Sequence, residues 1–126
     1  NVDILLAFEK LEALRYLDYL KHAGRIIVNE AEIYPPAVNL GAMTYPENAV
    51  DLVRHAFSTV MVVKGRELAA ASGNIRTENT VLLGALSQWL DFDIAIWERV
   101  LKEAFHPKAL DANLQAFHLG RDYREG

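Results

Sequence analysis

Three short apolar segments alternate with helical patterns in the first half of this chain, and this alternation restricts the fold more than any other feature. The segments DILLAF, RIIVN and TVMVVK occupy residues 3–8, 25–29 and 59–64. Each is a largely continuous apolar run rather than an apolar–polar alternation, which is typical of strands covered on both faces. The intervening helical patterns extend over residues 9–22, 44–57 and 66–72.

Strand–helix repeats of this kind predict parallel strands joined by right-handed crossovers, with helices on both faces of the sheet. We therefore expect an α/β fold of three layers, α/β/α, with a mostly parallel, Rossmann-like sheet. The length of 126 residues indicates a single domain over residues 1–126. Three strands are few for six helices, so we expect N-terminal strands that this chain lacks, or a sheet completed by a partner.

Local signals predict where several helices begin and end. Gly24 follows the first helical pattern at the position of a C′ glycine, and Thr44 with Glu47 matches a capping box. Pro107 suits the first turn of the last helix, and Gly120 suits the position just after its end. The three C-terminal helices are expected at about 76–90, 94–105 and 107–119.

Composition excludes several classes of function. The net charge is −4 and no run of lysine or arginine occurs, so a nucleic-acid interface is not expected. Cysteine is absent, which removes disulfides and thiolate ligands for metals from this chain and fits a reducing, cytoplasmic location. No apolar run approaches the roughly 20 residues of a membrane span. The four histidines show no metal-ligand spacing, so no metal site is expected.

Polar residues follow the strand segments where ligands of open α/β sheets usually bind. Glu9, Asn29 and Lys64 stand at these carboxyl ends. One interpretation is a polar rim over a ligand crevice. The other is that strand ends are simply exposed and therefore polar. No nucleophile elbow or cysteine nucleophile is visible, so the residues themselves indicate no catalytic group.

Two loops are further candidates for a ligand crevice or a subunit interface. Pro35 and Pro36 could form a rigid lip or an ordinary stiff loop, and the apolar residues around them favour an interface. Gly73 and Asn74 precede a helix and could present backbone N–H groups to an anion. No phosphate-loop pattern accompanies them. The favoured interpretation of this pair is a C′ glycine followed by an N-capping asparagine.

Two asparagines fall on helix faces that are otherwise apolar. Asn79 lies three and four residues before Leu82 and Leu83, and Asn113 lies four residues before Phe117. A buried amide without partners costs about 1–3 kcal/mol. We therefore predict that Asn79 and Asn113 are buried structural residues that hydrogen-bond neighbouring groups, rather than ligand contacts.

Four segments carry a resemblance to a known family, in order along the chain. They are DILLAFEKLEAL at 3–14, RIIVNEAEIYPP at 25–36, Gly73-Asn74 with Asn79 and Leu83-Gly84-Ala85, and Pro107-Lys108 through Asn113 to Gly120. Together they resemble the gamma-type subunit of 2-oxoacid:ferredoxin oxidoreductases. The doubled proline and the end of the chain look most like the small (beta) subunit of the indolepyruvate branch, while the pyruvate and 2-oxoisovalerate branches stay open. The glycine-rich turn that opens this family has no counterpart in the sequence.

The resemblance implies a non-catalytic subunit that is inactive when isolated. Enzymes of this family use thiamine diphosphate to decarboxylate a 2-oxoacid, pass electrons through iron–sulfur clusters to ferredoxin, and release acyl-CoA. The resemblance places these cofactors in the complex and none in this chain. It implies a large thiamine diphosphate-binding subunit as partner, with the gamma-type domain shaping the thiamine site or receiving coenzyme A. The resemblance assigns no catalytic residue to this sequence.

Other hypotheses remain open beside the resemblance. A stand-alone α/β module that binds a small molecule or nucleotide would use the polar strand-end rim. An interaction protein would dock a partner through the loop at residues 35–45. The isolated chain could also form a homodimer.

Overall fold

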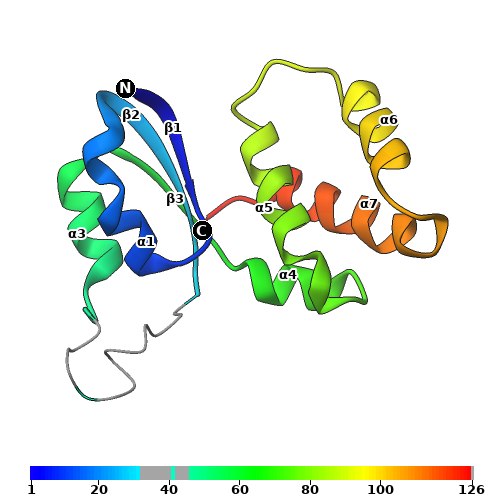
Figure 1. Cartoon of the computed structure of the whole chain (residues 1–126), viewed down its shortest axis with the longest axis horizontal. Helices are drawn as coiled ribbons and strands as arrows, with labels where there is room; N and C mark the ends of the chain where they lie inside the picture. Colours follow the sequence, from blue (N-terminus) through cyan, green and yellow to red (C-terminus); the bar gives the residue numbers. More distant parts are fainter. Residues whose placement is uncertain (32–40, 42–45, 126) are drawn as a thin grey trace. The chain divides into compact units, whose positions relative to one another are not determined.

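The computed structural model describes residues 1–31, 41 and 46–125. The chain divides into two compact units, Asn1–Val62 and Val63–Gly126, which are described separately below. The first contains most of the sheet, and the second is helical (Figure 1). The single domain expected from length stays a prediction.

The first unit is built on a parallel sheet. Its strands are β1 (Val2–Ala7), β2 (Leu20–Asn29) and β3 (Thr59–Val63), in the order β1-β2-β3. β1 and β2 run parallel, with Leu5 opposite Ile26 and Ala7 opposite Val28. The predicted α/β class with a parallel sheet is therefore confirmed, as are the three strand segments. The alternation of parallel strands with helices in this unit is consistent with a Rossmann-like fold.

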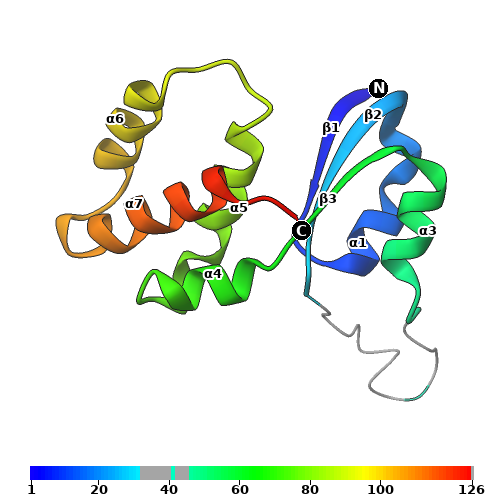
Figure 2. The same ribbon diagram turned by 180° about the vertical axis from the view of Figure 1, so that it is seen from behind.

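Two helices cover one face of this sheet. They are α1 (Lys10–Arg15) and α3 (Ala49–Ala56), and Figures 1 and 2 show both on the same side. This placement follows from the strand order, because successive right-handed crossovers in one direction put both helices on one face. Whether helices also cover the opposite face, as the three-layer prediction requires, stays a prediction.

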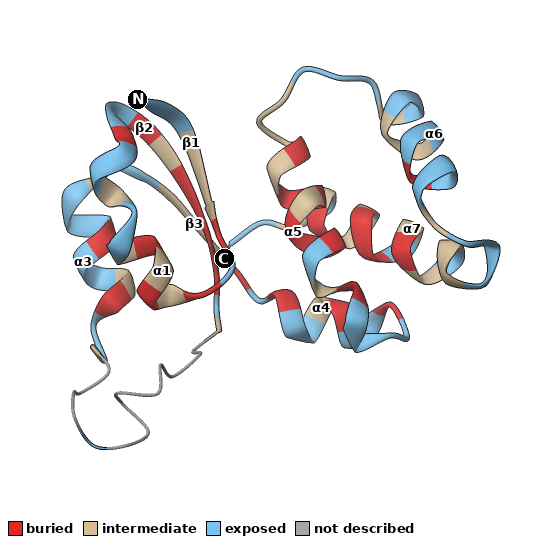
Figure 3. Ribbon diagram, viewed as in Figure 1, coloured by how far each residue is buried: buried red, intermediate tan, exposed pale blue. Residues whose placement is uncertain are grey.

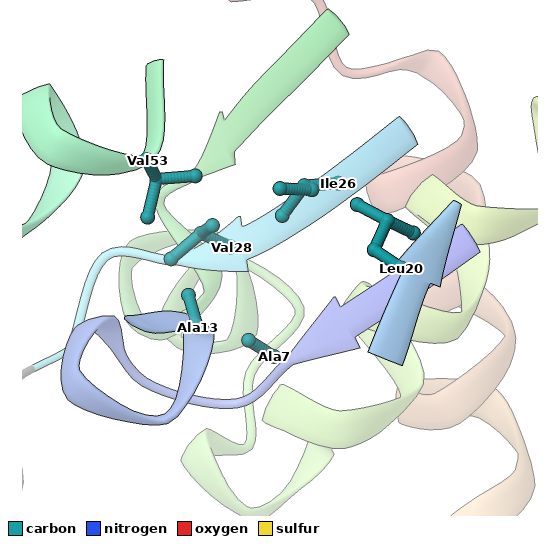
Figure 4. Packing of buried hydrophobic residues seen from close by; sticks show 6 residues of the cluster. All are labelled: Ala7, Ala13, Leu20, Ile26, Val28 and Val53. Carbon is teal, nitrogen blue, oxygen red and sulfur yellow. The ribbon is translucent and has the colours of Figure 1, made fainter. Parts of the chain in front are cut away.

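A small apolar core joins the sheet to its helices. Ile26 and Val28 lie two residues apart on β2, so they share a sheet face, and they pack with Ala13 of α1 and Val53 of α3 (Figure 4). Ile26, Val28 and Val53 are all fully buried. Burial of such side chains is worth about 1.5–3 kcal/mol each, so this packing stabilises the first unit.

The helix predicted over residues 9–22 is wrong in its second half. α1 ends at Arg15, a single 3₁₀ turn covers Leu17–Tyr19, and β2 begins at Leu20. The reason is strand pairing: Val2 pairs with Leu20 and Ile4 with Arg25, so two steps along β1 face five along β2. Backbone hydrogen bonding across the sheet outweighs the helical periodicity of this segment.

Gly24 belongs to that irregular stretch of β2 rather than to a helix end. A Cβ at Gly24 would overlap the side chain of Leu20 and lie 2.9 Å from the carbonyl oxygen of Lys21. The glycine therefore allows the strand to fold closely on itself where the register shifts. Its predicted role as a C′ glycine is wrong.

α3 begins later than the predicted capping box. Its N-cap is Asn48, and Thr44 lies outside the described residues. Ala49 and Val53, four residues apart, form its buried face.

The second unit contains four helices. They are α4 (Gly65–Ala71), α5 (Glu78–Ser87), α6 (Ile94–Ala104) and α7 (Pro107–Asp122), with a 3₁₀ turn at Ile75–Thr77 before α5. The three predicted C-terminal helices are confirmed, including Pro107 in the first turn of α7. Buried positions lie along α5 and the facing part of α7, whereas α6 buries only Leu101 (Figure 3).

α5 and α7 approach each other through two glycines. A Cβ on Gly84 of α5 would overlap the carbonyl oxygen of Phe117, and a Cβ on Gly120 of α7 would overlap the carbonyl oxygen of Val81. Gly120 therefore lies inside α7 as a contact residue, and its predicted position after the helix end is wrong.

Candidate functional site

The carboxyl ends of β1 and β2 meet, as parallel strands require. Glu9 and Asn29 are both buried there, at 4% and 3% exposure. The Asn29 side-chain amide donates to the Phe8 carbonyl at 3.2 Å, and the Lys10 N–H donates to the Ala31 carbonyl at 3.0 Å. The structure thus brings these two predicted site residues together, and it uses Asn29 to join the loops that follow the two strands.

The Glu9 carboxylate is the N-cap of α1. One oxygen accepts from the Glu12 N–H at 2.6 Å, and the other accepts from the Leu11 N–H at 3.0 Å. These N–H groups belong to the first turn of α1, where a carboxylate is also favoured by the helix dipole. The arrangement supports α1 rather than a reacting group.

The other predicted site residues lie elsewhere in the chain. Pro35 and Pro36 lie outside the described residues. Lys64 is exposed and precedes α4 in the second unit. Gly73 and Asn74, also in the second unit, are exposed. Glu9 and Asn29 thus belong to the first unit, whereas Lys64, Gly73 and Asn74 belong to the second.

Gly73 and Asn74 form the turn between α4 and α5. Gly73 has a φ of 96°, a left-handed conformation that favours glycine, and its N–H donates to the Ala70 carbonyl. The Asn74 side chain accepts from the Arg76 N–H at 2.9 Å. These contacts are those of a C′ glycine followed by an N-capping asparagine. They end α4 and begin the 3₁₀ turn before α5.

A buried polar contact links α5 to α7. The Asn113 side chain is 6% exposed; its oxygen accepts from the Thr80 hydroxyl at 2.7 Å, and its amide donates to the Ala109 carbonyl at 2.9 Å. The buried amide thus has a partner for its donor and its acceptor.

Asn79 does not take part in this contact. It is exposed, and the prediction that it is buried is wrong. α5 buries Val81, Leu82 and Ala85 together with the small residues Thr80, Gly84 and Ser87, so of the leucines that defined the predicted face only Leu82 is fully buried. The spacing of these small residues, i, i+4 and i+7, is the signal that could have identified the face.

A second set of contacts, not predicted from the sequence, holds the end of α7 to α5. Gln88 donates from its side-chain nitrogen to the carbonyls of Gly120 at 3.0 Å and Tyr123 at 2.9 Å. Arg121 donates to the Ser87 hydroxyl and Arg124 to the Gln88 side-chain oxygen, both at 3.0 Å. Gln88 thereby adds a second donor to the Gly120 carbonyl, which also accepts from the Tyr123 N–H, and links α5 to the end of α7.

Metal-ligating side chains are not gathered in the described part of the chain. Its residues include no group of three histidine, aspartate or glutamate side chains placed to hold a metal ion. The whole sequence has no cysteine, so it supplies no thiolate for an iron–sulfur cluster. Within the described ranges, no helix combines the length and apolar character of a membrane span.

Comparison with protein families gives one match over almost the whole chain. The model for the pyruvate ferredoxin/flavodoxin oxidoreductase family matches residues 1–123. This agrees with the resemblance carried by the four sequence segments.

Several curated relatives share substantial identity with the chain. Indolepyruvate oxidoreductase subunit IorB of Thermococcus kodakarensis is 40% identical over 127 residues, and its counterpart in Pyrococcus horikoshii is 38% identical over 125. The same subunit of Archaeoglobus fulgidus is 32% identical over 124 residues. Each match covers 95% of this chain and 62% of the relative, so the chain spans less than two thirds of these proteins.

Proposed function

This chain belongs to the pyruvate ferredoxin/flavodoxin oxidoreductase family, and from that membership we propose that it forms part of a non-catalytic subunit of a 2-oxoacid ferredoxin oxidoreductase. The observation that carries the proposal is the family match over residues 1–123. The relatives named indolepyruvate oxidoreductase subunit IorB support an aryl 2-oxoacid, indolepyruvate, as the substrate of the complex.

The proposed reaction of the complex is an oxidative decarboxylation. The 2-oxoacid loses CO₂, its acyl group is transferred to coenzyme A, and two electrons pass singly through iron–sulfur clusters to ferredoxin. Thiamine diphosphate in the large partner subunit would supply the carbon chemistry. Because this chain has no cysteine, we propose that the ligands of the iron–sulfur clusters come from other parts of the complex. The lack of cysteine also fits a cytoplasmic complex.

A non-catalytic role is supported by what the polar residues do. The Glu9 carboxylate caps a helix, the Asn29 amide joins two loops, and the Asn113 amide joins two helices. Each of these polar groups makes a hydrogen bond that stabilises the fold. The contribution of such a subunit would be to shape the thiamine site of its partner or to receive coenzyme A.

Reconstitution of the complex tests this proposal. The intact natural chain is mixed with the large subunit, and ferredoxin reduction is followed with indolepyruvate and coenzyme A. We expect little turnover with either subunit alone and full turnover with both. If the large subunit alone matched the rate of the mixture, the subunit role would be wrong. Faster turnover of pyruvate or 2-oxoisovalerate than of indolepyruvate would instead overturn only the substrate assignment.

A ligand screen on this chain alone distinguishes the subunit proposal from the alternative of a stand-alone binding module. Nucleotides, coenzyme A and 2-oxoacids are tested for a shift in the melting temperature. A ligand at 100 times its Kd should stabilise the fold by about 2.7 kcal/mol. We expect no such shift from a nucleotide, because Glu9 and Asn29 at the strand ends are buried in local contacts.

A further inference from the structure

The second unit contains a groove with an apolar part and an acidic part. Its volume is about 480 Å³. α7 lines it with Leu114, Gln115, His118, Leu119 and Asp122, while α6 adds Glu98 and α4 adds its last residue, Ala71. None of these residues takes part in the Thr80–Asn113 contact or in the contacts at the end of α7.

The shape of the groove suits the side chains of a protein segment. The α7 residues recur from Leu114 to Asp122 on one helix face, a length of about 12 Å at 1.5 Å per residue. Leu114 and Leu119 are only half-buried, and Gln115 and Asp122 are exposed. Small-molecule sites enclose 70–90% of their ligand. A surface this open is better matched by an amphipathic helix laid along a groove.

The charge of the lining selects the partner. Glu98 and Asp122 contribute carboxylates, and the described residues that line the groove include neither lysine nor arginine. His118 lies near one of them, with its Nε2 atom 3.7 Å from a Glu98 oxygen. Arg121 and Arg124, which are close in sequence, are bonded to side chains of Ser87 and Gln88. A segment with lysine or arginine beside apolar side chains therefore complements both parts of the groove.

We propose that this groove binds a basic amphipathic segment of the large partner subunit. The inference rests on the proposed subunit function and extends it, because it locates one contact between the two chains. The leucines would receive apolar side chains, and the carboxylates of Glu98 and Asp122 would meet the flanking cations.

A charge reversal at the rim tests the proposal. Asp122→Lys changes an exposed residue in the last turn of α7, where a cation is favoured by the helix dipole, so the fold should persist. Glu103→Lys is the matched control, because Glu103 is exposed in the last turn of α6 and does not line the groove. Thermal melts followed by circular dichroism check that both variants are folded.

The measurement is the Kd of the intact natural chain for the purified large subunit, at low and at high ionic strength. We expect Asp122→Lys to weaken binding about tenfold or more and to reduce the salt dependence, with Glu103→Lys close to wild type. If Asp122→Lys bound as tightly as wild type, or if both variants were weakened equally, the groove proposal would fail while the subunit role stood.

Two further outcomes would also overturn the inference. If the wild-type chain did not bind the large subunit, the proposed function and the groove contact would fall together. If ultracentrifugation showed a homodimer of the chain alone that Asp122→Lys dissociates, the occupant would be a second copy rather than the large subunit.

Discussion

The Thr80 hydroxyl donates a 2.7 Å hydrogen bond to the buried side-chain oxygen of Asn113, and this bond joins α5 to α7. It lies between helices that approach closely through Gly84 and Gly120. The two features are connected. Small side chains allow α5 and α7 to approach closely, and the polar groups buried by that approach then need hydrogen-bond partners within the interface.

Loss of the Thr80 hydroxyl should destabilise this interface. Thr80→Val keeps the shape of the side chain but removes the donor to Asn113, so we expect a loss of about 1–3 kcal/mol in the free energy of unfolding. Urea denaturation measures the change. Asn79→Ala is the neighbouring control, because Asn79 is exposed and its replacement should cost no more than about 0.5 kcal/mol. Equal effects of the two substitutions would contradict the importance of the Thr80–Asn113 bond.

Alanine at either contact glycine should destabilise the second unit. In an ordinary helix interior, glycine to alanine gains about 1 kcal/mol. Gly84→Ala and Gly120→Ala should reverse that sign and cost about 1–3 kcal/mol, because the added Cβ overlaps a backbone carbonyl of the facing helix. Chemical denaturation gives the sign directly. Ala95→Gly, at an exposed position of α6, calibrates the helix propensity in the same chain. A stabilising Gly84→Ala would show that the helices can separate without cost.

Removal of the α1 cap should weaken the first unit. Glu9→Ala leaves the Leu11 and Glu12 N–H groups without their carboxylate partner, and we expect a loss of about 0.5–2 kcal/mol. Amide hydrogen exchange should show faster exchange at these two N–H groups. Glu47→Ala serves as the control, since Glu47 is exposed before α3, whose N-cap is Asn48. Unchanged exchange at Leu11 and Glu12 would rule out the capping role of Glu9.

The exposed pair of Asp3 and Lys21 predicts a pH effect. The Lys21 ammonium donates to the Asp3 carboxylate at 2.8 Å, and this hydrogen bond with its charge attraction lowers the pKa of Asp3 below its usual value. A lowered pKa adds stability above the unfolded pKa, and this contribution is lost as the pH falls through the folded pKa. The effect should be small and salt-sensitive because both side chains are exposed. An NMR titration should show the midpoint of Asp3 rising in Lys21→Met; an unchanged midpoint would contradict the pairing.

Local sequence patterns predicted the correct element where they favoured either helix or strand clearly. The segments at 3–8 and 59–64 became β1 and β3, and the C-terminal patterns became α5, α6 and α7. The segment at 25–29 became the second half of β2, whereas the residues before it had a helical pattern and formed strand. Their pairing with β1 depends on residues 18 and more positions away, which no local pattern contains.

The class of fold, the family and the type of most elements could be inferred from the amino-acid sequence, because these depend on periodicity and on motifs within short windows. The side of α5 that faces α7 depends instead on how the two helices pack in the folded chain. That choice set Thr80 rather than Asn79 as the partner of Asn113. It also decided that Gly120 is a contact residue inside α7, because a glycine at a helix end and a glycine at a helix crossing look alike until the facing backbone is in place.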